Sequence, residues 1–226
     1  MLFRRLLLLL LVLWSAPALA DRIPPPPERE VPRVVLGLWD SHLEPNRRFS
    51  ALHRFAEMPL NHLGLILRYH DLAEGPPPAE ALAGLRGVVL WFPGNAPMAD
   101  PNGLLDWLEQ AMARNVRLVV LSDPNLTADL QGHRTPTERI ERFWGWLGLK
   151  PSGRYIGDTF DLVMLHKEAA MVEFERPLTG ALPGFDVMTT VDAAVHGHLV
   201  VRRKDDGRSE STLIATGPHG GYAAAD

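Results

Sequence analysis

Residues 88–121, with the sequence VVLWFPGNAPMADPNGLLDWLEQAMARNVRLVVL, predict a strand, a helix and a second strand in succession. The runs 88–92 and 116–121 are short, apolar and bounded by turn residues, which is typical of strands buried on both faces. Between them, Asp100 and Pro101 predict a helix start, because aspartate caps free N–H groups and proline fits the first turn. The apolar residues that would share one face of this helix are Leu104, Leu105, Leu108 and Met112. A helix between two such strands favours a right-handed crossover and parallel pairing.

The same alternation extends toward the N-terminus. Residues 34–39 and 63–67 are two further apolar runs that predict buried strands. Between them, four apolar residues have the spacing of one helix face, and we expect this helix to stop before Pro59. These four residues are Phe49, Leu52, Phe55 and Ala56.

The alternation also extends toward the C-terminus. Thr135, Pro136 and Glu138 have the arrangement of a capping box and predict the start of a third helix, which Gly148 would end. Its buried face would consist of Ile140, Phe143, Trp144 and Leu147. Strands that alternate with helices require a parallel sheet covered on both faces, so we expect an α/β, flavodoxin-like layered core over residues 33–149.

From residue 149 onward the pattern changes to short apolar runs joined by turns such as Asp205-Asp206-Gly207. The runs that predict strands are residues 160–165, 187–191, 194–201 and 211–215. We therefore expect a β-rich, antiparallel C-terminal extension that continues or flanks the same sheet. Residues 33–226 would then form a single domain.

The first twenty residues have the three parts of a secretory signal peptide. Arg4 and Arg5 are basic, residues 6–14 are apolar, and Ala18-Leu19-Ala20 precede a cleavage site before Asp21. We expect residues 1–20 to be removed and the mature chain, without a membrane span, to be periplasmic or secreted. An uncleaved N-terminal anchor is the alternative, and it would leave the domain on the same side of the membrane. Residues 21–32, which include four consecutive prolines, predict an extended linker.

Composition excludes several classes of function. The chain has no cysteine, so it has no disulfide, no thiolate nucleophile and no thiolate metal site. Without Arg4 and Arg5 the formal net charge changes from −4 to −6, and no basic stripe suggests a nucleic-acid partner. No glycine-rich phosphate loop and no Gly-x-Ser-x-Gly nucleophile elbow occurs. We expect no nucleotide or flavin cofactor and no activated serine.

A metal site is not expected either. His196 and His198 would lie on the same side of a strand, because side chains alternate along it. This pair is half of a metal site at most, since no third ligand occurs at a diagnostic spacing. A structural role for the two histidines is the alternative interpretation.

Ligands of open parallel sheets bind at the carboxyl ends of the strands, so the loops after the four apolar runs form the candidate ligand-binding rim. Three carboxylates could meet there, where they would raise one another's pKa or hold a cation. In the other interpretation they cap turns. The candidate rim residues are Asp40, Tyr69, Asp71, Asn95 and Asp123.

Several stretches of the chain resemble one family of exported bacterial proteins. These stretches are PLNHLGL (59–65), YHD (69–71), RGVVLWF (86–92), LDWL (105–108), RLVVL (117–121) and IATGPHGGY (214–222). They are similar to the α/β module that precedes the deacetylase in proteins related to the Pel polysaccharide deacetylase. The resemblance implies a periplasmic role in cell-surface polysaccharide metabolism, a polysaccharide ligand and a downstream deacetylase domain. Residues 1–226 would then be the first part of a longer protein.

The resemblance does not extend to the deacetylase chemistry. Asp205-Asp206 is followed by a glycine turn and by no spaced histidine pair, so the metal motif of such deacetylases is missing. The predicted layout also resembles the class I glutamine amidotransferase fold, whose thiol nucleophile a chain without cysteine cannot supply. Catalytic residues are therefore not assigned, and two hypotheses stay open. One is a non-catalytic accessory module, and the other is a carbohydrate-active hydrolase that uses Asp40, Asp71 and Asp123. Carboxylates within about 10 Å of each other in a concave pocket would favour the hydrolase.

Overall fold

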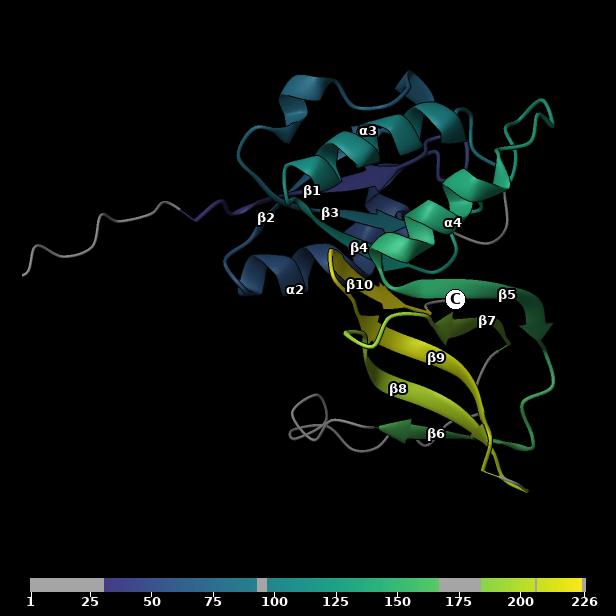
Figure 1. Cartoon of the computed structure of the whole chain (residues 1–226). Coiled ribbons are helices and arrows are strands. Elements are labelled where there is room, and N and C mark those ends of the chain that lie inside the picture. Colours follow the sequence, from purple (N-terminus) through teal and green to yellow (C-terminus); the bar gives the residue numbers. More distant parts are fainter. Residues whose placement is uncertain (1–30, 93–96, 167–183, 206, 225–226) are drawn as a thin grey trace, which may run out of the picture. The chain divides into compact units, whose positions relative to one another are not determined.

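The computed structural model describes residues 31–92, 97–166, 184–205 and 207–224. The strands within these ranges are β1 (Val34–Trp39), β2 (Ile66–Asp71), β3 (Leu85–Trp91), β4 (Arg117–Leu121), β5 (Leu149–Ile156), β6 (Leu162–His166), β7 (Phe185–Thr190), β8 (His196–Arg203), β9 (Ser209–Thr216) and β10 (Gly220–Ala223). The described part contains an eight-stranded sheet with the order β2-β1-β3-β4-β10-β9-β8-β6 and a two-stranded sheet of β5 and β7 (Figure 1). The elements that begin at Pro32 and later form one compact body.

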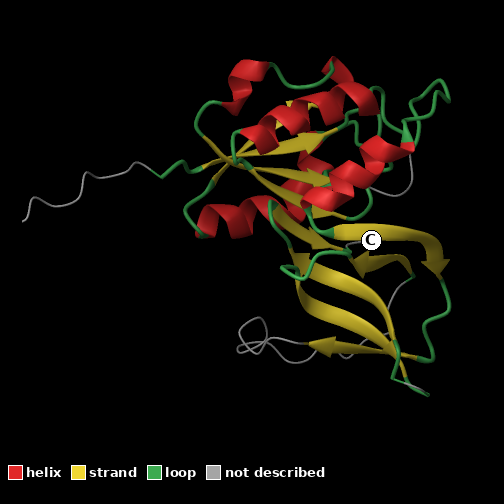
Figure 2. Cartoon of the chain, in the orientation of Figure 1, coloured by secondary structure: helices red, strands yellow, loops and turns green. Residues whose placement is uncertain are grey.

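The first half of the large sheet is parallel. β1 pairs with β2 and β3, and β4 pairs with β3 and β10, all in parallel. Its helices are α2 (Glu57–His62), α3 (Pro101–Ala113) and α4 (Thr137–Trp146), with shorter turns η1 (Arg47–Phe49), η2 (Leu52–Ala56), η3 (Leu72–Glu74) and η4 (Ala79–Leu82). Figure 2 shows these helices gathered around the parallel strands and away from β6, β8 and β9. This arrangement is the flavodoxin-like layered sheet that the sequence predicts.

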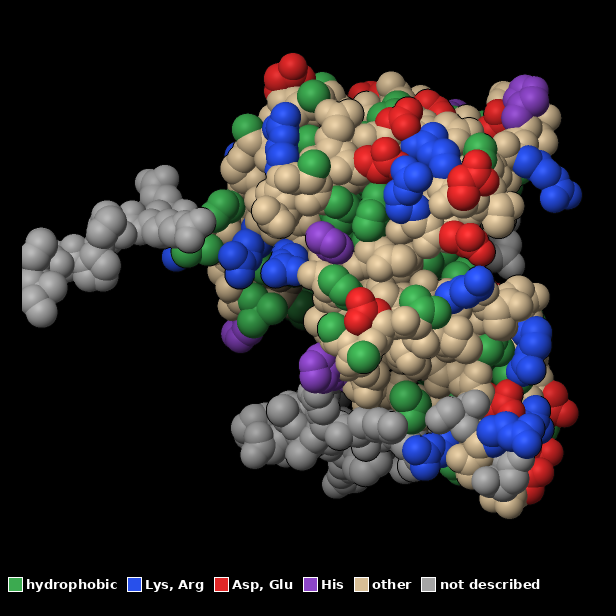
Figure 3. All heavy atoms as spheres, viewed as in Figure 1, with side chains coloured by type: hydrophobic (Ala, Val, Ile, Leu, Met, Phe, Trp, Pro, Cys, Tyr) green, Lys and Arg blue, Asp and Glu red, His purple; other side chains and the backbone are tan. Residues whose placement is uncertain are grey.

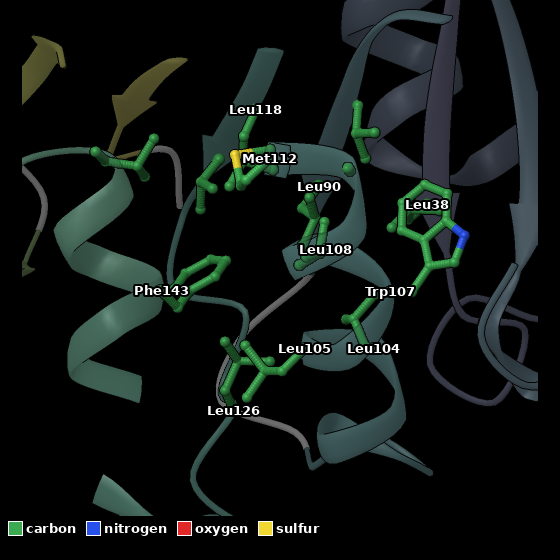
Figure 4. Packing of buried hydrophobic residues seen from close by; sticks show 14 of the residues in the cluster. Leu38, Leu90, Leu104, Leu105, Trp107, Leu108, Met112, Leu118, Leu126 and Phe143 are labelled. Atoms are coloured by element: carbon green, nitrogen blue, oxygen red, sulfur yellow. The ribbon is translucent and has the colours of Figure 1, made fainter. Parts of the chain in front are cut away.

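The α3 helix begins as its sequence predicts. The Asp100 carboxylate accepts a hydrogen bond from the Gly103 N–H at 2.8 Å, and Pro101 occupies the first turn. Its apolar face packs against the sheet and α4 in the main core (Figure 4). Members of this core from α3, the strands and α4 include Leu104, Leu105, Leu108, Met112, Leu38, Leu90, Leu118 and Phe143. The opposite face of the sheet has a smaller core, in which Val35, Leu67 and Val89 pack against Leu52 of η2.

Two expectations near the second strand are wrong. The strand expected at residues 63–67 begins only at Ile66, because Leu63 ends α2 and Gly64 adopts a φ of 76°. The preceding helix does not stop before Pro59 either. Pro59 is the third residue of α2, and the first four N–H groups of an α-helix need no partner within it. Phe49 and Phe55, expected on a buried face, are 72% and 54% exposed.

The capping box expected at the start of α4 is also wrong. The residue before the helix is Pro136, which provides no side-chain cap, and the buried Thr135 hydroxyl makes no hydrogen bond. The expected burial of Phe143, Trp144 and Leu147 is confirmed. Gly148 ends the helix with a φ of 66°, a conformation that favours glycine.

The C-terminal part is β-rich and antiparallel, as expected. β9 pairs with β10 and β8, and β8 pairs with β6, so these strands extend the large sheet. The sequence did not predict β5 or β10. In β10, Gly220 approaches the Leu118 carbonyl so closely that a side chain there would clash. None of the helices in the described part of the chain has the length and apolar character needed to span a membrane.

Candidate functional site

Asp40 and Asp71 lie together at the carboxyl ends of β1 and β2. The Asp40 carboxylate, 1% exposed, accepts hydrogen bonds from the His42 backbone N–H at 2.8 Å and contacts its Nδ1 at 3.1 Å. The Asp71 Oδ1 accepts hydrogen bonds from the backbone N–H groups of Ser41 and Ala73, both at 3.0 Å. Because successive backbone nitrogens are less than about 4 Å apart, the two Oδ1 atoms lie within roughly 10 Å of each other.

These two carboxylates hold turns. Burial alone would raise the pKa of Asp71, but the hydrogen bonds from Ser41 and Ala73 outweigh it and hold the pKa below its usual value. Aspartate commonly has this structural role in turns, in which its ionised carboxylate accepts hydrogen bonds from backbone N–H groups. Asp40 and Asp71 therefore lie close together because both hold the loop after β1 in place.

Tyr69 lies on the face of the sheet that carries the smaller core, toward α2. Its hydroxyl donates to Glu57 Oε2 at 2.5 Å, and His53 Nδ1 lies 2.6 Å from the same oxygen. The Arg47 guanidinium carbon lies 4.8 Å from the centre of the tyrosine ring. Burial and the hydrogen bond to Glu57 raise the pKa of Tyr69, and the same hydrogen bond lowers the pKa of Glu57. Tyr69 is thus engaged with α2, and Asn95 lies outside the described residues.

Asp123 lies in a separate cavity of about 180 Å³ after β4. The walls come from the loop after β4, from α4, and from β5 and β7, and the lining residues are Asp123, Leu126, Thr127, Ile140, Trp144, Pro151, Gly153, Arg154, Asp186 and Val187. The Asp123 Oδ1 accepts one hydrogen bond, from the Asn125 N–H at 3.0 Å. Burial, together with the neighbouring negative charge of Asp186, raises the pKa of Asp123.

This cavity combines apolar walls with two carboxylates and a guanidinium group. It is smaller than the roughly 300 Å³ or more of most small-molecule sites, so it has room for one ring or end group. The sequence indicated Asp123 from its position after a strand but gave no signal for Asp186 or Arg154. Both come from the β-rich part, where no sequence pattern predicts which strands lie near the parallel sheet.

Ser122 occupies a strained position between β4 and this cavity. Its φ is 60°, which non-glycine residues rarely adopt, and it is 6% exposed. A sharp turn of this kind directly after a strand is how α/β hydrolases present a nucleophile. Here, however, the Ser122 hydroxyl donates to the Phe92 carbonyl at 3.1 Å, and no described histidine hydrogen-bonds to it.

The histidine pair considered from the sequence contributes no metal site in the described ranges. His198 Nε2 lies 2.8 Å from the Thr216 hydroxyl. Across the residues with described positions, no group of three or more His, Asp or Glu side chains has the arrangement of a metal site.

A second cavity, of about 310 Å³, lies among β7, β8 and β9. Hydroxyl side chains dominate its polar lining, and its lining residues are Met188, Thr189, Thr190, Val195, Gly197, Val200, Glu210, Ser211 and Thr212. The one carboxylate among these lining residues, that of Glu210, forms ion pairs with Arg203 at 2.5 Å and with Arg154 at 2.9 Å. These two hydrogen-bonded guanidinium groups lower the pKa of Glu210.

Comparison with known proteins finds solved structures of similar fold at low sequence identity. No protein-family model and no curated protein matches the chain. A ThuA-like protein from Bacteroides uniformis is 14% identical with a TM-score of 0.47, over 89% of this chain and 85% of that one. A glutamine amidotransferase from Thermotoga maritima is 11% identical with a TM-score of 0.48, over 86% and 75%. A cold-adapted β-galactosidase from Rahnella is 12% identical with a TM-score of 0.50, over 86% of this chain and 28% of that one.

At this level of identity the likeness is one of fold. The strand order β2-β1-β3-β4-β10 and its parallel pairing confirm the expected flavodoxin-like layered sheet, together with the strand-rich C-terminal part.

Proposed function

We propose that this chain is a non-catalytic accessory module of an exported bacterial protein that modifies or exports cell-surface polysaccharide. It would bind an end group of the polysaccharide at the carboxyl edge of the sheet and act beside a downstream deacetylase domain. The signal-peptide sequence and the resemblance to the Pel deacetylase-related module support the context. The hydrogen bonds that the polar side chains at this edge form with the backbone support a non-catalytic role.

The observation that carries the proposal is the hydrogen bonding of Ser122. A serine nucleophile needs a base within hydrogen-bond reach to take its proton. The Ser122 hydroxyl instead donates to a backbone carbonyl, and Asp40 and Asp71 accept backbone N–H groups. Because these polar groups are already hydrogen-bonded to the backbone, they hold the loops at the carboxyl edge of the sheet in place. This suits ligand recognition and does not suit bond cleavage.

A second function is favoured by one specific observation, the pair of Asp123 and Asp186. A carboxyl group with a raised pKa beside a second carboxylate is the arrangement by which glycoside hydrolases divide the acid and base roles. The alternative is therefore a carboxylate-dependent carbohydrate hydrolase with its site in the 180 Å³ cavity.

Binding can be measured by titrating the chain with amino-sugar oligosaccharides, acetylated and not, while NMR follows the backbone amides. We expect shifts at Asn125, Thr127 and Arg154, and loss of binding in Arg154→Gln, because Arg154 is one of the residues that line the cavity. Arg142→Gln, an exposed change on α4 whose residue does not line the cavity, is the matched control. Equal loss in both variants, or shifts confined to other surfaces, would exclude this cavity as the binding site.

A further inference from the structure

The outward side of α2 and its flanking turns carries large exposed apolar residues. Leu52, Ala56 and Leu60 on the inward side pack against the sheet. Phe55 is only partly covered, although its ring also contacts the Trp91 ring, with the ring centres 5.7 Å apart. The exposed apolar residues here are Phe49 (72%), Phe55 (54%), Met58 (77%) and Leu63 (73%). Such a concentration on one short segment indicates a contact surface.

Arginines surround these apolar residues, and we call the whole set the arginine–apolar patch. The arginines are Arg33, Arg47, Arg48 and Arg54, all exposed. None of the four forms an ion pair within the described ranges, and Arg54 lies over the Phe55 ring at 4.9 Å. The one acidic residue between positions 45 and 63, Glu57, is already bonded to Tyr69 and His53. Figure 3 shows apolar, basic and histidine side chains next to one another over α2.

We propose that the arginine–apolar patch docks onto the anionic surface of a phospholipid bilayer. Arginines next to exposed Phe, Met and Leu are the composition of interfacial segments, in which the cations meet lipid phosphates and the apolar side chains enter the acyl boundary. Met58 and Leu63 favour a lipid over a sugar, because sugar rings stack on flat aromatic faces and flexible aliphatic chains suit acyl chains. The patch is basic although the chain as a whole has a formal net charge of −4, so its charge complements anionic lipids specifically.

The point at which the chain enters the folded body supports the same orientation. The Ile66 N–H donates to the Arg33 carbonyl at 2.8 Å, and the Arg33 guanidinium lies beside Gly64, directly after Leu63. The chain therefore enters β1 next to the patch, and the apolar run at residues 6–14 precedes this point in the sequence. If residues 1–20 are retained, which is the alternative to their removal, the patch lies next to the point at which the tethered chain enters the fold.

The chain has no cysteine, so one introduced cysteine gives a unique label site. We would attach an environment-sensitive NBD fluorophore to Met58→Cys in the full chain and add vesicles of phosphatidylcholine with phosphatidylglycerol. We expect a blue shift with these vesicles, little change with pure phosphatidylcholine, and reversal by salt, because the attraction is electrostatic. The same label at Gln110→Cys, exposed on α3 across the sheet, should not respond. This local readout distinguishes patch contact from tethering by residues 1–30.

The arginines provide the second arm of the test. Arg48→Gln with Arg54→Gln should weaken the response at residue 58 by about 30-fold in lipid concentration, since each arginine near an anionic surface contributes about fivefold. Arg114→Gln, at the end of α3, is the matched control and should have no effect. A label at residue 58 that stays unchanged while the chain is vesicle-bound would overturn the proposal. A response to an acidic polysaccharide but not to vesicles would also overturn it, and would assign the patch to a glycan.

Discussion

Two aspartates at the same edge of the sheet have opposite environments. Asp71, the last residue of β2, accepts hydrogen bonds from two backbone N–H groups, and its pKa lies below the usual value. Asp123, after β4, accepts one N–H, faces Asp186 in a cavity, and has a raised pKa. The difference teaches that position after a parallel strand does not decide the role of a carboxylate. Burial, the number of N–H donors and the neighbouring charge together decide it.

The largest expected effect is on the Asp71 side. Asp71→Ala should lower the free energy of unfolding by about 2 kcal/mol, because two backbone N–H groups lose a charged acceptor. Asp71→Asn, which keeps one acceptor oxygen, should lose less. Urea unfolding followed by circular dichroism measures both.

The stability cost of Asp71→Ala should depend on pH in a definite direction. A carboxyl group with a depressed folded pKa contributes stability above its unfolded pKa of about 3.9 and loses it as the pH falls through the folded value. The cost of Asp71→Ala should therefore shrink in acid. A cost that stays constant down to the lowest accessible pH would show that the ionised carboxylate is not what holds the turn.

Asp123 should behave in the opposite way. Because burial and Asp186 raise its pKa in the folded state, ionisation of Asp123 destabilises the fold as the pH rises above about 4. Asp123→Asn retains an oxygen for the Asn125 N–H and should raise the free energy of unfolding at neutral pH, because it removes the buried charge beside Asp186. The gain should disappear in acid, where Asp123 is protonated. If Asp123→Asn instead lowered the free energy of unfolding at neutral pH, Asp123 and Asp71 would not differ in the way described.

The smallest expected effect is at Ser122, between the two sides. Ser122→Ala loses the hydrogen bond to the Phe92 carbonyl and keeps the strained backbone, so it should cost about 1 kcal/mol. Ser122→Gly loses the same bond but relieves the strain, and its net cost should be below about 0.5 kcal/mol. Thermal unfolding compares the two variants. A larger cost for glycine than for alanine would mean that the backbone at residue 122 is not strained.

The sequence predicted the parallel half of the fold because its elements have regular patterns. The run 34–39 became β1 without a shift, and Asp100-Pro101 marked the start of α3. β10 was missed because Gly220 and Gly221 provide no apolar run, and a close approach to β4 is what their lack of side chains permits. β5 was missed because its residues between Lys150 and Arg154 are polar or turn-forming.

The candidate site was predictable only where it depends on strand order. The parallel topology puts Asp40, Asp71 and Asp123 at one edge, and the structure brings the first two together. Side-chain direction was not predictable, so the engagement of Tyr69 with Glu57 had no sequence signal. Asp186 and Arg154 reach Asp123 through long-range pairing of the C-terminal strands, which local patterns do not encode.

The most direct test of the account is turnover by the purified chain on acetylated and non-acetylated amino-sugar polymers, with and without added divalent metal. Release of acetate and of reducing ends would be measured for the natural sequence, Asp123→Asn and Asp71→Asn. The account predicts no release above the background of the variants, because Asp40, Asp71 and Ser122 at the carboxyl edge are hydrogen-bonded to the backbone. Turnover that is abolished by Asp123→Asn and retained in Asp71→Asn would contradict it and would make the cavity of Asp123 and Asp186 an active site.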